Sequence, residues 1–238
     1  MIRTDAGAFL LCGGSVGGAL RGAAGKDEMT KRNEGRHHYA LILAGGKSSR
    51  MGREKALILV EGETLLARAV RFWNLSGLAD RILLSVGSPS RLQFLEPLPE
   101  RAEPICDFFE DSGPMAGILS AFRQTDAELL YVSAVDMPYL RRDAAEILLR
   151  EISKVSETGR LPDAAVFLRD GRPEPLFGVY RRSAAGAAER LLRSGDRKMS
   201  RLLNSVETVY CPTEDGMAEI FRNINTPEDL QHLLRREK

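Results

Sequence analysis

The sequence predicts an α/β fold, a Rossmann-like, doubly wound, mostly parallel sheet with helices on both faces in a single domain. Short apolar runs recur along the chain, at residues 39–44, 82–86, 129–135 and 164–168, and each has the length and composition of a buried strand. Longer segments with helical periodicity separate these runs. Such alternation is typical of a parallel sheet that is covered by helices, and ligands are expected beyond the carboxyl ends of its strands.

The segment between the first two apolar runs illustrates the helical pattern. Its apolar side chains fall on one helical face, with Arg68 and Arg71 off that face: Leu65, Leu66, Ala69, Val70 and Trp73. We expect this face to pack on the sheet and Trp73 to be a core residue.

A second helix is predicted at the carboxyl end of the chain. Thr226 is suited to the N-cap position, and Pro227 to the first helical turn. Glu228 and Asp229 make that turn acidic, which favours a helix start. The sequence therefore predicts a closing helix from about residue 226.

Length and composition are those of one ordinary globular domain. The chain has 238 residues, of which 43% are hydrophobic, enough to bury a full core. We see no repeat or linker after Tyr39, so residues 39–238 are predicted to form one domain and residues 1–38 a disordered extension. A secretory signal is the alternative for the extension, but Asp5 and four glycines in the would-be apolar region disfavour it. Translation from Met29 is a third possibility.

Charge and cysteine content exclude several classes of function. The net charge is +1, which offers no broad positive field for nucleic acid, and no apolar segment is long enough to span a membrane. Cys12, Cys106 and Cys211 are scattered, without zinc or disulfide spacing, so we expect a reducing, cytoplasmic location. The chain lacks the GxxxxGK[ST] motif of P-loop GTPases.

The residues best suited to chemistry lie in one glycine-rich segment, residues 41–55, where the first predicted strand ends. Gly45 and Gly46 have no Cβ, so backbone N–H groups there can approach a ligand closely. Ser48 and Ser49 add hydroxyl donors suited to phosphate oxygens. The segment also carries four cationic side chains, those of Lys47, Arg50, Arg53 and Lys55. This pattern favours a phosphate-binding loop over an ordinary basic loop.

The same segment resembles the L-A-G-G-x-S-x-R-M-G-x-x-K signature of the molybdenum-cofactor guanylyltransferases, the MobA family, and matches every fixed position. Further similar segments are Asp107 followed by residues 113–119, the strand end at residues 135–138, residues 175–180 and residues 223–230. The resemblance covers residues 39 to about 236.

The resemblance implies a magnesium-dependent nucleotidyltransferase. Asp136, at the carboxyl end of the 129–135 run, would hold Mg²⁺ with help from Asn225, since Mg²⁺ needs few protein carboxylates when a triphosphate supplies other oxygens. The residues themselves also permit a turn or helix N-cap role for Asp136. The implied GTP-binding set is Leu43, Ala44, Gly45, Gly46, Ser48, Lys55, Ser85, Asp107 and Asp136.

In the implied reaction, the terminal phosphate of Mo-molybdopterin attacks the α-phosphorus of GTP, and pyrophosphate leaves. Positioning and charge stabilisation dominate such transfers, so the catalytic residues would be Arg50, Lys55 and Asp136, without a nucleophilic triad. Expected protein partners are molybdenum-insertion proteins and molybdoenzyme chaperones.

Other members of this broad group remain as alternatives: cytidylyltransferases for the same cofactor, sugar-1-phosphate nucleotidylyltransferases, and a non-catalytic GTP-binding regulator. The Ala44-Gly45-Gly46 sequence favours guanine. Four positions depart from the family pattern: Glu54, Ser85, Val135 and Glu174. Six basic residues are candidates for pterin contact or for a solvated basic face: Arg169, Arg172, Arg193, Arg197, Lys198 and Arg201.

Overall fold

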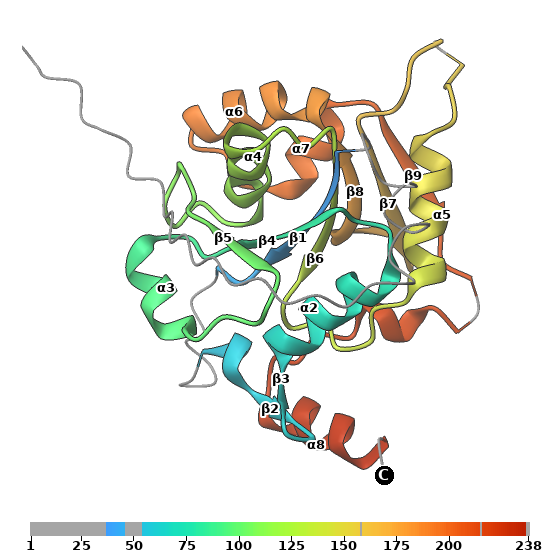
Figure 1. The fold of residues 1–238 in the computed structure, drawn as a ribbon. Coiled ribbons are helices and arrows are strands. Elements are labelled where there is room, and N and C mark those ends of the chain that lie inside the picture. Colours follow the sequence, from blue (N-terminus) through green and yellow to red (C-terminus); the bar gives the residue numbers. More distant parts are fainter. Residues whose placement is uncertain (1–36, 46–53, 158, 215, 237–238) are drawn as a thin grey trace, which may run out of the picture. The chain divides into compact units, whose positions relative to one another are not determined.

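One seven-stranded sheet forms the centre of the structure, a computed structural model that describes residues 37–45, 54–157, 159–214 and 216–236 (Figure 1). The strand order is β5-β4-β1-β6-β8-β7-β9. These strands are β1 (His38–Leu43), β4 (Arg81–Ser85), β5 (Ala102–Ile105), β6 (Leu129–Ala134), β7 (Ala164–Arg169), β8 (Arg172–Arg181) and β9 (Thr208–Pro212). The four predicted runs are thus strands β1, β4, β6 and β7, with ends within one residue of those expected. The predicted α/β fold is confirmed.

Among the described strands of this sheet, only β8 runs against its neighbours. It pairs antiparallel with both β6 and β7, whereas the other strand pairs of the sheet are parallel. The reversal occurs at Asp170 and Gly171, which have φ angles of 51° and 73° between the paired residues Arg169 and Arg172. A two-residue Asp-Gly turn with positive φ at both positions matches the twist of a hairpin.

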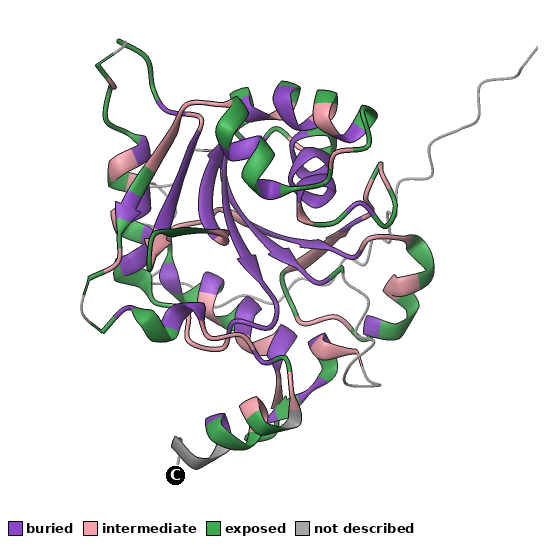
Figure 2. Ribbon diagram, turned by 180° about the vertical axis from the view of Figure 1, so that it is seen from behind, coloured by how far each residue is buried: buried purple, intermediate pink, exposed green. Residues whose placement is uncertain are grey.

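Helices cover both faces of the sheet. Side chains alternate along β1, so that Ala40 and Ile42 pack in one apolar core and Leu41 and Leu43 in the other. The first core is closed by α2 (Leu65–Ser76) and α5 (Arg142–Ile152), and the second by α4 (Pro114–Gln124), α6 (Ala185–Arg193) and α7 (Met199–Ser205). Figure 2 shows the resulting pattern of buried strands and helices with one buried side.

The predicted apolar face of α2 is confirmed. Its five apolar residues are all buried, and Arg71 lies outside, paired with Glu63. Trp73 is 1% exposed, and its indole Nε1 donates a 2.9 Å hydrogen bond to the Ser133 hydroxyl on β6. This buried bond fixes α2 across the central strands.

The closing helix, α8 (Pro227–Arg236), begins as predicted. The Asp229 backbone N–H donates to the Thr226 hydroxyl oxygen at 3.2 Å, and the Thr226 N–H donates to the Asp229 carboxylate at 2.9 Å. This reciprocal pair is a capping box with aspartate in the third position. It orders the turn that carries Asn225, whose N–H donates to the same carboxylate.

A short hairpin contacts both this helix and α2. Its strands are β2 (Leu59–Val60) and β3 (Glu63–Thr64), and Val60 packs in a small apolar cluster with Ile224 and Leu233. A 3-10 turn, η1 (Lys55–Leu57), precedes it, and a second, η3 (Ala218–Phe221), precedes the loop to α8. Two further elements are α3 (Pro89–Leu95) and the 3-10 turn η2 (Arg182–Ala184).

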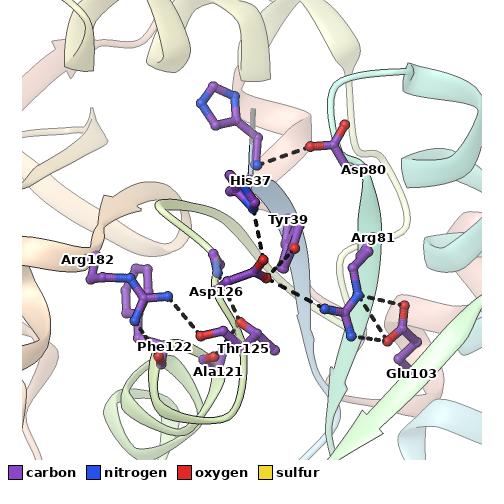
Figure 3. Close-up of polar contacts among 12 residues, drawn as sticks. His37, Tyr39, Asp80, Arg81, Glu103, Ala121, Phe122, Thr125, Asp126 and Arg182 are labelled. Atoms are coloured by element: carbon purple, nitrogen blue, oxygen red, sulfur yellow. Dashed lines mark hydrogen bonds and ion pairs between the residues drawn. The ribbon is translucent and has the colours of Figure 1, made fainter. Parts of the chain in front are cut away.

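A polar network holds the amino-terminal end of β1 (Figure 3). Asp126 accepts a hydrogen bond from the Tyr39 hydroxyl and lies 3.0 Å from His37 Nδ1 and 3.8 Å from Arg81. Arg81 in turn pairs with Glu103 on β5. These contacts brace the strands at the end opposite to the one at which ligands are expected.

The predicted extension at residues 1–38 lies almost wholly outside the described residues, so it stays a prediction. Within the described ranges, no helix combines the length and apolarity needed to cross a lipid bilayer.

Candidate functional site

Two adjoining cavities lie at the carboxyl ends of β1, β4 and β6. The larger has a volume of about 750 Å³ and the smaller of about 160 Å³. Leu43, Gly45 and Pro114 line both. The predicted nucleotide residues of the described chain are therefore brought together at the edge of the sheet where doubly wound folds bind ligands.

The larger cavity lies between the end of β1, the start of α3 and the loop before α4. Its lining comprises Leu43, Gly45, Ser85, Gly87, Ser88, Ser90, Arg91, Asp107, Glu110, Asp111, Ser112, Gly113, Pro114 and Arg197. Its volume is in the usual range for a small-molecule site. Gly45 and Gly87 approach so closely that a Cβ on Gly45 would meet Gly87 N at 3.4 Å.

Asp107 is held firmly in this cavity. Its carboxylate accepts a 2.9 Å hydrogen bond from the Ser85 hydroxyl, and its backbone N–H donates to the Gly87 carbonyl. The next N–H, that of Phe108, donates to the buried Ser120 hydroxyl at 2.9 Å. Burial raises the pKa of Asp107 to about 6, against the opposing effects of Ser85 and of the Arg91 charge.

Gly117 on α4 makes room for this arrangement. A Cβ at Gly117 would lie 2.6 Å from Ser85 Oγ and 2.9 Å from a methyl group of Leu43. A side chain at this position would therefore displace two residues that line the cavity.

The smaller cavity is lined by Asp136, one of the two predicted metal residues, and the other, Asn225, contacts Lys55, which lines the same cavity. Lys55 Nζ lies 2.7 Å from Asp136 Oδ2 and 2.7 Å from Asn225 Oδ1, although these residues are far apart in the sequence. Asp136 is in a turn after β6 and well before α5, so it is not a helix N-cap. Its carbonyl accepts a 2.9 Å hydrogen bond from the buried Ile224, which anchors the loop that carries Asn225.

The two oxygen atoms that contact the Lys55 ammonium suit a magnesium ion. The Asp136 carboxylate and the Asn225 amide oxygen converge on one point, which the Lys55 ammonium occupies as a stand-in cation. Mg²⁺ prefers oxygen ligands and takes one or two carboxylates together with substrate phosphates. Among the described residues, no group of three or more His, Cys, Asp and Glu could hold a metal by itself, and Mg²⁺ ordinarily takes its remaining ligands from waters and substrate phosphates.

Several predicted residues are not tested by this geometry. Gly46, Ser48 and Arg50 lie outside the described residues, so their roles stay predictions. Ala44 lines the smaller cavity, but its N–H donates to the Ser85 carbonyl at 3.0 Å. Of the predicted residues, Leu43, Gly45, Ser85 and Asp107 line the larger cavity, and Lys55 and Asp136 the smaller.

The structure adds residues that the sequence reasoning missed. Arg91 lines the larger cavity and pairs with Glu54, which lines the smaller, where Asn223 also lies. Gly87 also lines the larger cavity, and its place directly after a predicted strand could have marked it as a binding residue. Arg91 had no such signal, because one arginine in a helical segment is ordinarily a solvent-exposed residue.

The structure places three of the basic residues proposed for pterin contact in different surroundings. Arg197 lines the larger cavity and donates to the Asp111 carbonyl at 3.0 Å. Arg193 pairs with Glu189 on the surface of α6. Arg169 pairs with Glu174 at 2.6 Å, and burial raises the pKa of that glutamate.

Comparison with known proteins identifies relatives of this chain. The MobA-like NTP transferase domain matches residues 40–209. A probable molybdenum cofactor guanylyltransferase of Geobacillus sp. (strain WCH70) is 29% identical over 82% of this chain and 96% of its own length. Molybdopterin-guanine dinucleotide biosynthesis protein A from Archaeoglobus fulgidus superposes with a TM-score of 0.71 at 29% identity, covering 83% of this chain and 97% of that one.

A solved structure of an enzyme with a different activity shares the fold. The 2-C-methyl-D-erythritol 4-phosphate cytidylyltransferase from Thermus thermophilus superposes with a TM-score of 0.59 at 17% identity, covering 83% of this chain and 97% of that one. At that identity the likeness concerns the fold alone. The domain match, by contrast, spans more than half of the chain. This chain belongs to the MobA-like NTP transferase family.

Proposed function

We propose that this protein is a molybdenum cofactor guanylyltransferase, which transfers GMP from GTP to Mo-molybdopterin and releases pyrophosphate. The observation that carries the proposal is the convergence of Lys55, Asp136 and Asn225 beside a second cavity that contains Asp107. The smaller cavity then receives the reacting phosphates, and the larger one the guanosine.

The chain's own side chains account for binding and charge stabilisation. Lys55 moves its ammonium from Asp136 to the triphosphate oxygens, where it offsets the charge that develops on the α-phosphate. Arg50, in the same loop, is proposed to grip the triphosphate in a bidentate manner. The attacking phosphate of molybdopterin forms a bond to the α-phosphorus as the bond to the β-phosphate oxygen breaks, and the electron pair leaves with pyrophosphate.

Magnesium is part of the proposal. Asp136 and Asn225 would hold the ion once Lys55 has turned to the nucleotide. The bound ion would neutralise phosphate charge at the reacting centre. Protein partners in the proposed cytoplasmic pathway are molybdenum-insertion proteins, which supply the pterin, and molybdoenzyme chaperones, which accept the product.

The chemistry of Asp107 supports guanine over cytosine. The Watson–Crick edge of guanine presents two adjacent N–H donors, whereas that of cytosine presents one amino group beside acceptors. An ionised carboxylate can accept two parallel donors. Asp107, oriented by Ser85, is proposed to accept these two donors from guanine. A cytidylyltransferase would gain less from a carboxylate at this place.

The test is pyrophosphate release with Mg²⁺, Mo-molybdopterin and each of GTP, CTP, ATP and UTP in turn, with the mass of the product nucleotide measured. We expect GTP-selective release that disappears in Asp136→Ala. Preference for CTP would indicate a cytidylyltransferase for the same cofactor. Product formation from a sugar phosphate instead would indicate a sugar-nucleotide enzyme, and GTP binding without turnover a regulator.

A further inference from the structure

Four charged side chains around the smaller cavity form two ion pairs. Lys55 contacts Asp136 at 2.7 Å, and Arg91 Nη2 contacts Glu54 Oε1 at 2.6 Å. Glu54 directly precedes Lys55 and lines the same cavity as Asp136. Two carboxylates therefore lie within reach of the lysine that the proposed function assigns to the triphosphate.

Arg91 is placed so that it engages one of these carboxylates and not the other. It projects from α3, and its Nη2 also donates to the Ala44 carbonyl at 3.3 Å. Its side chain is 22% exposed and that of Glu54 is 24% exposed, so solvent screens this pair less than a surface pair. The guanidinium thus joins the end of β1 to the residue before Lys55.

Loss of this pairing would change the charge balance of the cavity. A Glu54 carboxylate without its guanidinium would compete with Asp136 for the Lys55 ammonium. It would also repel the phosphates of an incoming nucleotide, with little solvent to weaken the repulsion. Because Glu54 adjoins Lys55 in the sequence and lines the same cavity, its charge stays close to that lysine.

We propose that Arg91 is a positioning residue for nucleotide binding, which neutralises Glu54 and so keeps Lys55 available to Asp136 and then to the triphosphate. The inference rests on the proposed function, because it concerns how the same site accepts GTP. Arg91 acts through Glu54 and Lys55, and its importance depends on the Glu54 charge.

A double-mutant cycle tests this dependence. The dissociation constant of Mg·GTP is measured by calorimetry for the wild type, Arg91→Met, Glu54→Gln and the double variant. We expect Arg91→Met to weaken binding at least about tenfold and the added Glu54→Gln to restore most of the loss, since interacting pairs show strong non-additivity. An arginine that merely braces the loop would give no such rescue, because Glu54→Gln removes a further contact.

The matched control is Arg142→Met with Glu146→Gln, which removes an exposed arginine–glutamate pair from α5. It should leave Mg·GTP binding within about twofold. Melting temperatures are recorded for every variant. If Arg91→Met melts below the assay temperature, Arg91→Gln, which keeps polar atoms but loses the charge, replaces it in the same cycle.

Two results would overturn the inference: wild-type affinity in the charge-removing Arg91 variant, or a double variant that binds as weakly as the single Arg91 variant. The second result would mean that Arg91 contacts the phosphates itself or only supports the fold. Failure of the proposed function is recognised separately, because the wild type would then show no GTP-selective release of pyrophosphate, whereas the double-mutant cycle reads only the binding of Mg·GTP.

Discussion

The Ser85 hydroxyl donates a 2.9 Å hydrogen bond to the Asp107 carboxylate and so joins the end of β4 to the segment after β5. This bond favours the ionised carboxylate, whereas burial favours the protonated form, and burial has the larger effect. Burial therefore raises the pKa of Asp107 to about 6. Its protonation state becomes a measurable property of the site.

The affinity for GTP should therefore depend on pH. If Asp107 accepts two N–H groups from guanine, binding requires the ionised carboxylate and weakens as the pH falls through about 6. Ser85→Ala removes a donor to the ionised form, which raises the pKa of Asp107 and moves the loss of affinity to higher pH. Calorimetric titrations with GTP between pH 5 and 8 measure both effects.

The control for this prediction is Ser205→Ala, which removes an exposed hydroxyl on α7 that bonds only to its own helix in the contacts described. It should keep the wild-type pH profile. A Ser85→Ala profile identical to that of the wild type would contradict the proposed part of Asp107 in base binding.

The same carboxyl group should affect the stability of the ligand-free protein. Its pKa is raised in the folded state, so ionisation disfavours folding, and the wild type should lose stability as the pH rises from about 4 to about 6, with no further change above that. Asp107→Asn has no carboxyl group at this position and so lacks this loss of stability. Across this pH range, the free energies of unfolding of the wild type and Asp107→Asn should change relative to each other by at most about 3 kcal/mol.

Urea unfolding of the wild type and Asp107→Asn at several pH values measures this difference. Only the change in their relative stability across the pH window is informative, because other groups titrate in both proteins. Equal pH dependence for the two proteins would show that the carboxyl group is not buried as described.

Loss of Asp136 should impair turnover much more than folding. Asp136→Ala removes the carboxylate that faces Lys55 and the proposed metal, so we expect the rate of pyrophosphate release to fall at least about a hundredfold. The backbone carbonyl that accepts from Ile224 is retained, and the melting temperature should change by only a few degrees. Stopped-flow kinetics measure the rate and thermal melts measure the stability. A large fall in both the rate and the melting temperature would contradict the catalytic role of Asp136.

Gly117→Ala should destabilise the protein even though alanine favours helices. The added Cβ would lie 2.6 Å from Ser85 Oγ and 2.9 Å from Leu43, which corresponds to overpacking by about 1–3 kcal/mol. GTP affinity should fall too, because both displaced residues line the larger cavity. Chemical denaturation and calorimetry measure the two losses.

The matched substitution is Gly186→Ala on α6, where the nearest atom to the new Cβ is the flexible end of Arg190 at 3.6 Å. This variant should be neutral or more stable by up to about 1 kcal/mol. A similar effect of both substitutions would mean that helix propensity, not packing at Ser85, decides the outcome.

The sequence by itself determined the features that depend on near neighbours. The alternation of apolar runs and helical stripes predicted β1, β4, β6, β7 and α2, because burial of one helical face follows from a repeat of 3.6 residues. Thr226 and Asp229 predicted the start of α8, because a cap is completed within one turn. The glycine-rich loop, through its resemblance to a known signature, predicted the family.

Only the tertiary structure decided the remainder. Strands β5 and β9 lie at the two edges of the sheet, where half-exposed residues and a proline replace the continuous apolar run of a central strand. The side-chain contacts of the site join residues that are separated by 37 to 170 positions in the sequence. These contacts pair Lys55 with Asp136 and Asn225, and Arg91 with Glu54. Such contacts depend on strand order and helix packing, which no local pattern in a single sequence encodes.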